Sequence, residues 1–314
     1  MTTKSVLVLI LSYNGKSLLE DSVSSYLACD YPNFKVAVID NGSSDGTLRY
    51  LTDHFPEVIT IRTNVNLGYS GGMNLGLSYA FDQHDYDYVL ISNNDVKADS
   101  AIISSLVATA GAGSKVAFVT GKVYYYDAPD TFQTVGKKHH PTYVNGGHIG
   151  RGEKDCGQYD QDCEIAFCDD IYWLVSKEVY LTTGGYDPEF FLQAEDFDWQ
   201  LRAKKAGYKI YYAFKAKLWH KESQTIGKVS AKKAYYDARN PTIAILKNCE
   251  SKVAVAYIRQ RVFRDLLFQA LKQLIRMRLG ISLAILGGLC STFYWWVKEK
   301  VTIFWHNAFY KASI

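Results

Sequence analysis

The sequence predicts an α/β fold, a doubly wound and mainly parallel sheet followed by a helical, basic extension. Two patterns support this fold class. Apolar β-branched runs alternate with amphipathic stretches along the first 110 residues, as strands and helices do in βαβ units. The charge then changes sign, because residues 251–314 carry ten Lys or Arg against two Asp or Glu, and the first 250 carry 25 against 30. We therefore expect an α/β domain over residues 1–245 and a helical region over 246–314.

The first half of the chain contains the elements expected of such a sheet. The run "SVLVLIL" is apolar throughout, which is typical of a strand buried on both faces. A glycine- and asparagine-rich loop opens the third helix, and Asp99 is placed to cap the fourth. The predicted strands span 5–11, 34–40, 58–63 and 87–92, and the predicted helices span 15–31, 48–55, 64–81 and 100–110.

The second half of the chain is less regular. Residues 121–165 are rich in Tyr, His, Gly and Asp without a clear period, so we expect a long loop or an irregular insertion there. Order returns over 171–187, a helix is predicted over 200–206 with Gly207 as its stop, and 208–220 has the composition of a strand. From about residue 231 the pattern is helical and basic.

The C-terminal region indicates a membrane surface as a partner. Residues 279–297 carry no charge over 19 positions, which is nominally long enough to cross a bilayer, although glycine, serine and threonine weaken that interpretation. Spanning, interfacial and core-packed placements all stay open. The apolar content favours a membrane surface over nucleic acid as the partner of the basic residues. The six cysteines lack CxxC spacing, as is typical of reduced thiols, so we expect a cytoplasmic protein held at the inner face of the plasma membrane.

Polar side chains follow three of the predicted strands. Ligands of doubly wound sheets bind at the carboxyl ends of the strands, so we expect these side chains to share one site. Neither a P-loop nor a GxGxxG pattern follows the first strand, which argues against P-loop and dinucleotide-binding proteins. The residues are Ser12, Tyr13 and Asn14 after the first strand, Asp40 and Asn41 after the second, and Asn93, Asn94 and Asp95 after the fourth.

Several of these residues suit a nucleotide that carries a diphosphate. Asp40 can accept a hydrogen bond from a nucleobase, although an Asx turn with a helix cap is the common alternative. Asp95 offers a hard oxygen ligand for Mg²⁺ or Mn²⁺, and His220 at another strand end can complete the coordination. The loop before the third helix adds glycines that let backbone approach a ligand and amides that can bind it, Gly68, Gly72, Asn66 and Asn74.

The stretch "FFLQAEDFDWQLRAKKAGY", residues 190–208, sets Glu195, Asp196 and Asp198 among aromatic residues. One interpretation is structural: acids in a first helical turn contribute about 0.3–1 kcal/mol each through the helix dipole, and Asp198 pairs with Arg202 at i,i+4. The other interpretation is functional, a general base in partly apolar surroundings near a metal ion.

Seven segments in order along residues 4–245 resemble the successive motifs of inverting glycosyltransferase family 2. The resemblance is closest to the bacterial rhamnosyltransferases and related enzymes of cell-surface polysaccharides. Its most specific parts are the Glu-Asp pair and the Ala-Arg-Asn that follows a Tyr pair. The segments are "VLILSYNG", "VIDNGSSDGT", "NVNLGYSGGMNLGL", "ISNNDV", "GGYDPEFFLQAEDFDWQLRAKKAGYKI", "LWHKES" and "YYDARN".

The resemblance implies a GT-A fold, a nucleotide-diphosphate sugar donor and a divalent cation, Mg²⁺ or Mn²⁺. It implies that Asp196 is the catalytic base with Glu195 beside it, and that Asp95 and His220 bind the metal. Asn93 stands where a strict DxD motif has its first Asp, which leaves the full ligand set open. It further implies that Arg239 and Asn240 lie near the donor or acceptor, that the other strand-end and loop residues bind the donor, and that Trp173, Asp198 and Trp199 contact the acceptor.

The function implied is transfer of a sugar to a hydroxyl of a glycan acceptor, expected to be lipid-linked, in polysaccharide biosynthesis such as that of O-antigen. L-rhamnose from dTDP-rhamnose is the first expectation, and galactofuranosyl, galactosyl or glucosyl transfer from a UDP-sugar is the alternative. A nucleotidyltransferase is disfavoured because "SYNGKS" replaces a basic glycine-rich loop. A non-catalytic nucleotide-sugar-binding or membrane scaffold protein is disfavoured by the intact acids. No nucleic-acid partner is expected, and the oligomeric state, a homodimer included, stays open.

Overall fold

The computed structural model describes residues 3–221 and 230–312, with side chains described as far as residue 302. The chain divides into two compact units, Met1–Gly227 and Lys228–Ile314. Each unit has a buried apolar cluster of its own. The second unit begins before residue 245, so the helix that contains the Arg-Asn pair belongs with the C-terminal helices.

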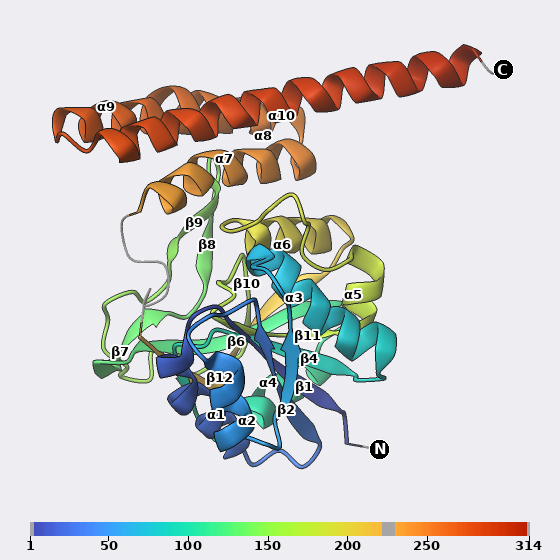
Figure 1. The fold of residues 1–314 in the computed structure, drawn as a ribbon, viewed down its shortest axis with the longest axis vertical. Coiled ribbons are helices and arrows are strands. Elements are labelled where there is room, and N and C mark those ends of the chain that lie inside the picture. The colour runs from blue at the N-terminus through green and yellow to red at the C-terminus, as the bar shows by residue number, and fades with distance from the viewer. Residues whose placement is uncertain (1–2, 222–229, 313–314) are drawn as a thin grey trace. The chain divides into compact units, whose positions relative to one another are not determined.

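The first unit is built on a ten-stranded sheet whose first part is parallel (Figure 1). β1 (Val6–Ser12) pairs in parallel with β2 (Phe34–Asp40) on one side and with β4 (Tyr88–Ser92) on the other. β3 (Ile59–Arg62) extends the sheet beyond β2. The register pairs Ser12 with Asp40, which brings the polar ends of β1 and β2 side by side.

The second part of the sheet is mixed rather than parallel. β11 (Tyr172–Ser176) runs antiparallel between β4 and β6 (Val116–Tyr125), and β12 (Lys209–His220) runs parallel to β6. Residues 121–165, expected to be irregular, are largely β structure. Their strands are short and register shifts interrupt the β6–β7 and β8–β9 pairs, so the period-2 pattern is broken. The remaining strands are β5 (Val96–Ala98), β7 (Ala128–Thr134), β8 (Lys137–His140), β9 (Val144–His148) and β10 (Cys163–Ile165).

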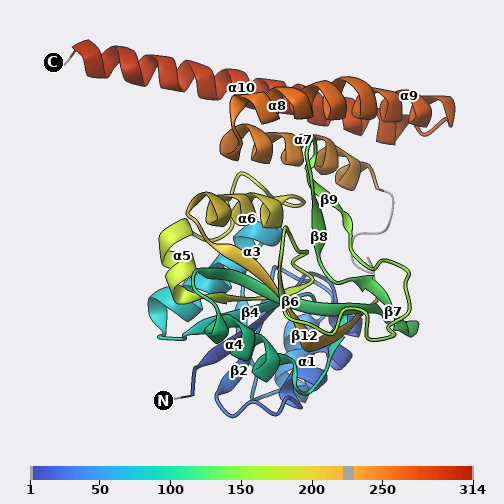
Figure 2. The ribbon, with the colours of Figure 1, turned by 180° about the vertical axis from the view of Figure 1, so that it is seen from behind.

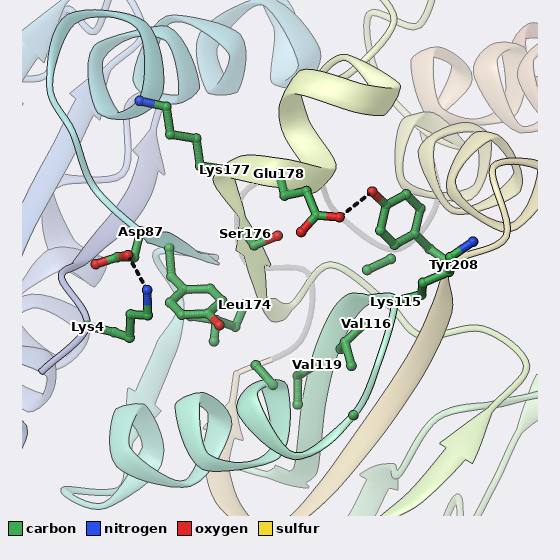
Figure 3. A pocket seen from close by; sticks show the side chains of 14 residues that line it. Lys4, Asp87, Lys115, Val116, Val119, Leu174, Ser176, Lys177, Glu178 and Tyr208 are labelled. Atoms are coloured by element: carbon green, nitrogen blue, oxygen red, sulfur yellow. Dashed lines mark hydrogen bonds and ion pairs between the residues drawn. The ribbon is translucent and has the colours of Figure 1, made fainter. Parts of the chain in front are cut away.

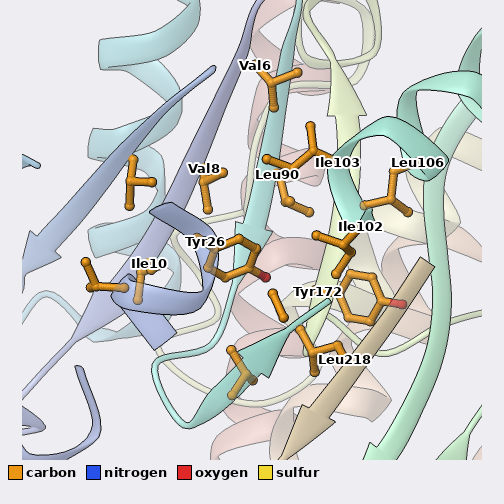
Figure 4. Packing of buried hydrophobic residues seen from close by; sticks show 14 of the residues in the cluster. Val6, Val8, Ile10, Tyr26, Leu90, Ile102, Ile103, Leu106, Tyr172 and Leu218 are labelled. Atoms are coloured by element: carbon orange, nitrogen blue, oxygen red, sulfur yellow. The ribbon is translucent and has the colours of Figure 1, made fainter. Parts of the chain in front are cut away.

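Helices cover both sides of the sheet (Figures 1 and 2). Successive residues of β1 point to opposite faces, so Val8 and Ile10 join one apolar cluster while Leu7 and Leu9 join the other. The first cluster packs under α1 (Leu19–Leu27), α2 (Thr47–His54) and α4 (Ile102–Ala112), and Figure 4 shows part of it. The second packs under α3 (Gly68–Ser78), α5 (Lys177–Thr183) and α6 (Glu195–Lys205). Two short turns complete the set, η1 (Lys16–Leu18) and the π-helical η2 (Tyr79–Gln83).

Two helix ends differ from the sequence-based prediction. Asp99 accepts the backbone N–H of Ala101 (3.0 Å), so it shapes the turn before α4, whose own N-cap is Ala101. α6 begins at Glu195, five residues before the predicted start, which puts all three acids in its first turn. Gly207 follows the end of α6 in a left-handed conformation (φ 85°), as predicted for a helix stop.

The second unit consists of helices. α7 and α10 pack closely at Gly288, where a Cβ atom would lie 2.5 Å from the carbonyl oxygen of Tyr235. Within the described part of the chain, one stretch, Leu279–Thr302, is long and apolar enough to cross a membrane, with mean hydropathy 1.4 and 22% of its most apolar window buried. The helices are α7 (Ala231–Asn248), α8 (Ser251–Tyr257), the π-helical η3 (Ile258–Leu266), α9 (Leu267–Ile275) and α10 (Leu279–Ala312).

Candidate active site

The loops after β1 and β2 form one polar edge of the sheet. Asn14 is left-handed (φ 50°) and donates its backbone N–H to the hydroxyl of Ser43 (2.9 Å), which joins the two loops. The side-chain amide of Asn94, after β4, lies 3.5 Å from the hydroxyl of the buried Ser12. Tyr13 is exposed. The structure thus brings together the strand-end residues that the sequence predicts to share a site.

Asp40 has a buried carboxylate oxygen to which no described residue donates a hydrogen bond. Its side chain is fully buried, and Oδ1 accepts the backbone N–H of Ser43 (3.0 Å). Oδ2 is buried without a hydrogen bond from any described residue, and the guanidinium of Arg62 lies 3.8 Å away. Buried carboxylate oxygens are rarely left without donors, so a ligand N–H would complete this arrangement.

Asn41 and Asn66 organise the loop that leads into α3. The side-chain oxygen of Asn41 accepts the backbone N–H of Leu67 (3.1 Å), and its amide donates to the carbonyl of Gly68 (2.9 Å). Asn66 accepts from the same amide (3.2 Å) and from the backbone N–H of Gly68 (2.8 Å). Gly72 allows this packing, because a Cβ atom there would lie 3.1 Å from the Asn41 amide. Through these contacts the two asparagines stabilise the loop of the predicted donor site.

α3 also holds the loop that precedes α6. Asn74 donates its amide to the carbonyl of Tyr186 (2.7 Å) and accepts the N–H of the same residue (2.9 Å). Tyr69 donates its backbone N–H to the carbonyl of Phe191 (2.8 Å). A Cβ atom on Gly68 would collide with that carbonyl, and Gly68 is left-handed (φ 77°), so glycine is required there for two reasons.

Asp95 and His220 meet at the ends of β4 and β12. His220 Nε2 lies 3.1 Å from Asp95 Oδ1, and both side chains are nearly buried. His220 Nδ1 lies 2.9 Å from the side-chain oxygen of Gln133, which accepts an N–H from that nitrogen. With both ring nitrogens protonated, the contact between His220 and Asp95 is an ion pair. With the proton on Nδ1 alone, Nε2 presents a lone pair beside the Asp95 carboxylate, and the two atoms could bind a cation together.

The donor set fits a divalent ion that is shared with a substrate. Within the described residues, no group of three or more His, Cys, Asp and Glu side chains is placed to hold a metal ion. Mg²⁺ and Mn²⁺ at phosphate-transfer sites are commonly held by one or two protein ligands together with phosphate oxygens. Asp95 and His220 therefore suit an ion whose remaining ligands come from a diphosphate and water.

The predicted base lies at the start of α6 after two strained residues. Gln193 (φ 70°) and Ala194 (φ 67°) are both left-handed, a conformation that is costly for residues with a Cβ atom. Glu195 is buried and Asp196 is half-buried. Burial raises the pKa of Asp196, the charge of Lys137 lowers it, and the net shift is upward. Asp196 is thus a stronger base than an ordinary aspartate.

The three residues predicted to contact an acceptor are buried. Asp198 binds Arg202 (2.8 Å), as the i,i+4 spacing predicts, but the aspartate has no exposed surface. The indole N–H of Trp199 donates to the hydroxyl of Thr183 (2.8 Å). Trp173 lies in the second apolar cluster. In this structure all three residues contribute to the packing of α6. None of them presents a surface to a ligand.

A second carboxylate group, absent from the sequence-based site, lies beside Asp196. Asp169 binds the ammonium of Lys137 and lies 3.2 Å from Nδ1 of His148, both on the β8–β9 hairpin. Asp170 accepts the hydroxyl of Tyr186 (3.3 Å). Burial alone would raise the pKa of Asp169, but Lys137 and His148 hold it well below its usual range. The signal in the sequence was the pair of acids directly before a strand, in "FCDDIYW".

Arg239 and Asn240 belong to the second unit. Within it, the guanidinium of Arg239 donates to the side-chain oxygen of Asn240 (2.7 Å) and to the hydroxyl of Ser291 on α10 (3.2 Å). Asn240 is fully buried and precedes Pro241 inside α7. Their predicted role near the donor or acceptor stays a prediction.

A separate cavity of about 300 Å³ lies at the end of the sheet where the parallel strands begin (Figure 3). It opens near the starts of β4 and β6, away from the carboxyl ends of the parallel strands. Several of its polar groups are bonded to one another, since Lys4 binds Asp87 (2.7 Å) and Tyr208 donates to Glu178 (2.9 Å). This cavity contains none of the predicted site residues.

The chain belongs to glycosyltransferase-like family 2, whose family model matches residues 4–235. It is 23% identical over 250 residues to an N-acetylglucosaminyl-diphospho-decaprenol L-rhamnosyltransferase of Mycobacterium tuberculosis, covering 70% of this chain and 77% of that protein. It is also 23% identical over 221 residues to poly-beta-1,6-N-acetyl-D-glucosamine synthases of Staphylococcus aureus, covering 70% of this chain. The match spans about half of those synthases.

Solved glycosyltransferase structures share the fold. A mannosyltransferase from Pyrobaculum calidifontis, in complex with GDP-mannose and Mn²⁺, superposes with a TM-score of 0.55 at 13% identity, over 93% of this chain and 88% of that one. TarS of S. aureus, residues 1–349, gives a TM-score of 0.55 at 17% identity, over 85% and 75% of the two chains. The GT-A type of fold expected from the sequence is confirmed.

Proposed function

We propose that this protein is a metal-dependent, inverting glycosyltransferase that moves a sugar from a nucleotide-diphosphate donor to a hydroxyl of a glycan acceptor. The observation that carries the proposal is the Asp95–His220 pair (3.1 Å), which follows β4 and ends β12. The backbone N–H of Asn93 donates to the carbonyl of Ile171 (2.9 Å), which links the metal-binding loop to the carboxylates beside Asp196. An inverting displacement on a diphosphate ester requires both a group that binds the leaving diphosphate, here the Asp95–His220 pair, and a base, here Asp196.

The reaction is a single displacement. Asp196 takes the proton from an acceptor hydroxyl while that oxygen attacks the anomeric carbon from the face opposite the diphosphate. The bond between the anomeric carbon and the diphosphate oxygen breaks, its electron pair leaves with the diphosphate, and the configuration inverts. Asp95 and His220 would hold the divalent ion, whose charge offsets the negative charge of the departing diphosphate. Asp40 would accept a base N–H, and Glu195 would support the position of Asp196.

For the donor and acceptor we propose L-rhamnose from dTDP-rhamnose and a lipid-linked sugar, in cell-surface polysaccharide synthesis. The name of the M. tuberculosis relative, which pairs L-rhamnose with a diphospho-decaprenol-linked sugar, supports this choice. The S. aureus relatives are named for a poly-N-acetylglucosamine product, so UDP-N-acetylglucosamine joins UDP-galactofuranose, UDP-galactose and UDP-glucose as an alternative donor.

A panel of these donors tests the proposal through nucleotide release, with Mn²⁺, Mg²⁺ or EDTA present. We expect metal-dependent release from one donor by the wild type. Asp196→Asn should lower that rate by about 10²–10⁴-fold, the usual contribution of a general base, with unchanged thermal unfolding. Asp82→Asn is the matched control, because Asp82 is an exposed aspartate that accepts a tyrosine hydroxyl (Tyr180, 3.0 Å). Binding of a nucleotide sugar without release, even with lipid-linked acceptor extract added, would favour a non-catalytic role.

We further propose that the second unit holds the protein at the inner face of a cytoplasmic membrane. Large apolar side chains on η3, on α9, in the turn after α9 and at the start of α10 are exposed, among them Phe263 (67%), Ile275 (72%) and Met277 (89%). Arginines and lysines lie between them, as in helices that bind anionic interfaces. The basic members are Arg259, Arg261, Arg264, Lys272, Arg276 and Arg278.

A further inference from the structure

Asp170 is a half-buried carboxylate that the displacement above does not use. It lies two residues before β11, which pairs antiparallel with β4 so that Tyr172 lies opposite Ser92. The N–H of Asn93 donates to the carbonyl of Ile171 (2.9 Å), which continues that pairing past the strand ends. Asp170 is therefore held next to the loop that carries Asp95.

The same segment is bonded to the catalytic helix. The side-chain oxygen of Gln200, on α6, accepts the N–H of Cys168 (2.8 Å), and its amide donates to the Cys168 carbonyl (3.0 Å). That amide also donates to the carbonyl of Asp196, one turn earlier (3.1 Å). Gln200 is fully buried, so this connection is fixed. Asp170 consequently lies between the metal-binding residues and the base.

The two adjacent acids have different surroundings. Asp169 is neutralised by Lys137 and contacts His148, as described above. Asp170 accepts the hydroxyl of Tyr186 (3.3 Å) and also lies beside the hydroxyl of Tyr69, which lowers its pKa, and within residues 3–221 and 230–302 no Lys, Arg or His forms an ion pair with it. Tyr186 is itself held by Asn74 and packs edge-on against Trp199, with ring centroids 4.9 Å apart. The position of Asp170 is thus fixed, and its side chain is partly accessible to a ligand.

We propose that Asp170 binds the acceptor sugar beside Asp196 and selects which of its hydroxyls faces that base. This inference rests on the proposed function. Burial, and then the neighbouring Asp196 charge, raise the pKa of Asp170, because two close carboxylates resist ionising together. We place the shared proton of this pair on Asp170, which then donates to one acceptor oxygen while Asp196 accepts the proton of an adjacent hydroxyl. A pair of this kind matches the vicinal hydroxyls of a sugar.

The test compares Asp170→Ala and Asp170→Asn with Asp82→Ala in the full-length protein. Octyl N-acetyl-β-D-glucosaminide serves as the probe acceptor and the active donor of the panel as the second substrate. We expect Asp170→Ala to raise the acceptor KM about tenfold or more, the effect of losing a hydrogen bond to a carboxyl group. Hydrolysis of the donor by water should change less than about twofold. Asp170→Asn, which keeps a donor group, should recover part of the acceptor affinity or alter the linkage of the product seen by NMR.

Two results would overturn the proposal. One is an acceptor KM and a product linkage that both match those of Asp82→Ala. The other is an equal loss of transfer and of donor hydrolysis, which would make Asp170 a structural residue of the donor site. A wild type that turns over no nucleotide sugar would instead count against the proposed function. Binding of the octyl glycoside, measured by saturation-transfer NMR, then still decides on Asp170: loss in Asp170→Ala alone supports the inference, and equal binding in both variants refutes it.

Discussion

At the scale of single residues, the candidate site depends on how charge is distributed around Asp196. Its carboxylate lies close to two other aspartates, Asp169 and Asp170, and to one ammonium group, that of Lys137. Lys137 is nearly buried and forms its ion pair with Asp169. The positive charge therefore acts on Asp196 from a fixed position, and it opposes the upward shift that burial produces.

Lys137 should set the pH dependence of sugar transfer. Because a base must be ionised to act, the rate rises with pH through the pKa of Asp196. Lys137→Met removes a positive charge that stabilises the ionised form, so that pKa should rise and the acid limb of the rate profile should move upward by about 1–3 pH units. Lys137→Arg retains the charge and serves as the control. The measurement is the transfer rate from pH 5 to 9, and an acid limb that stays in place would contradict this account.

At the scale of elements, the site depends on one close contact between α3 and the loop before α6. Asn74 donates one hydrogen bond to Tyr186 and accepts another from it, the backbone N–H of Tyr69 donates to the carbonyl of Phe191, and Gly68 provides the space. The glycine-rich loop was predicted to approach a donor. The structure shows that it also approaches the loop before α6, which the sequence pattern did not indicate.

Gly68→Ala should damage both stability and catalysis. The new methyl group would collide with the Phe191 carbonyl in addition to straining a left-handed residue, whose cost is about 1–2 kcal/mol. Gly46→Ala is the matched control, since Gly46 is equally left-handed (φ 85°) but a Cβ atom there has no neighbour within 4 Å. Thermal unfolding and nucleotide release should both fall further in Gly68→Ala than in Gly46→Ala. Equal effects of the two variants would mean that the contact does not matter.

At the scale of the whole molecule, the excess of positive charge in the C-terminal region predicts that the protein binds anionic membranes. Flotation with vesicles should recover the protein with phosphatidylglycerol-containing membranes and release it at high salt, because each basic residue near an anionic surface contributes about 1 kcal/mol. Replacing Arg259, Arg261 and Arg264 by Gln should weaken recovery, whereas replacing Lys35, Lys138 and Lys154, exposed lysines of the first unit, should not. Deletion of residues 251–314 should abolish recovery, and unchanged flotation of that truncated chain would rule out this membrane role.

The sequence by itself determined the parallel half of the sheet and the set of polar residues at the strand ends near Asp95 and His220. Continuous apolar runs and the polar residues after them are local patterns, and parallel strands necessarily bring their carboxyl ends to one edge. The tertiary structure alone decided three other features: the β structure of residues 121–165, the burial of Trp173 and Trp199, and the position of Asp170 beside Asp196. These depend on contacts between residues far apart in the chain, such as Gln200 with Cys168 and Lys137 with Asp169. The local hydrophobic pattern of the sequence does not indicate such contacts, because the partner of each residue belongs to a distant helix or strand.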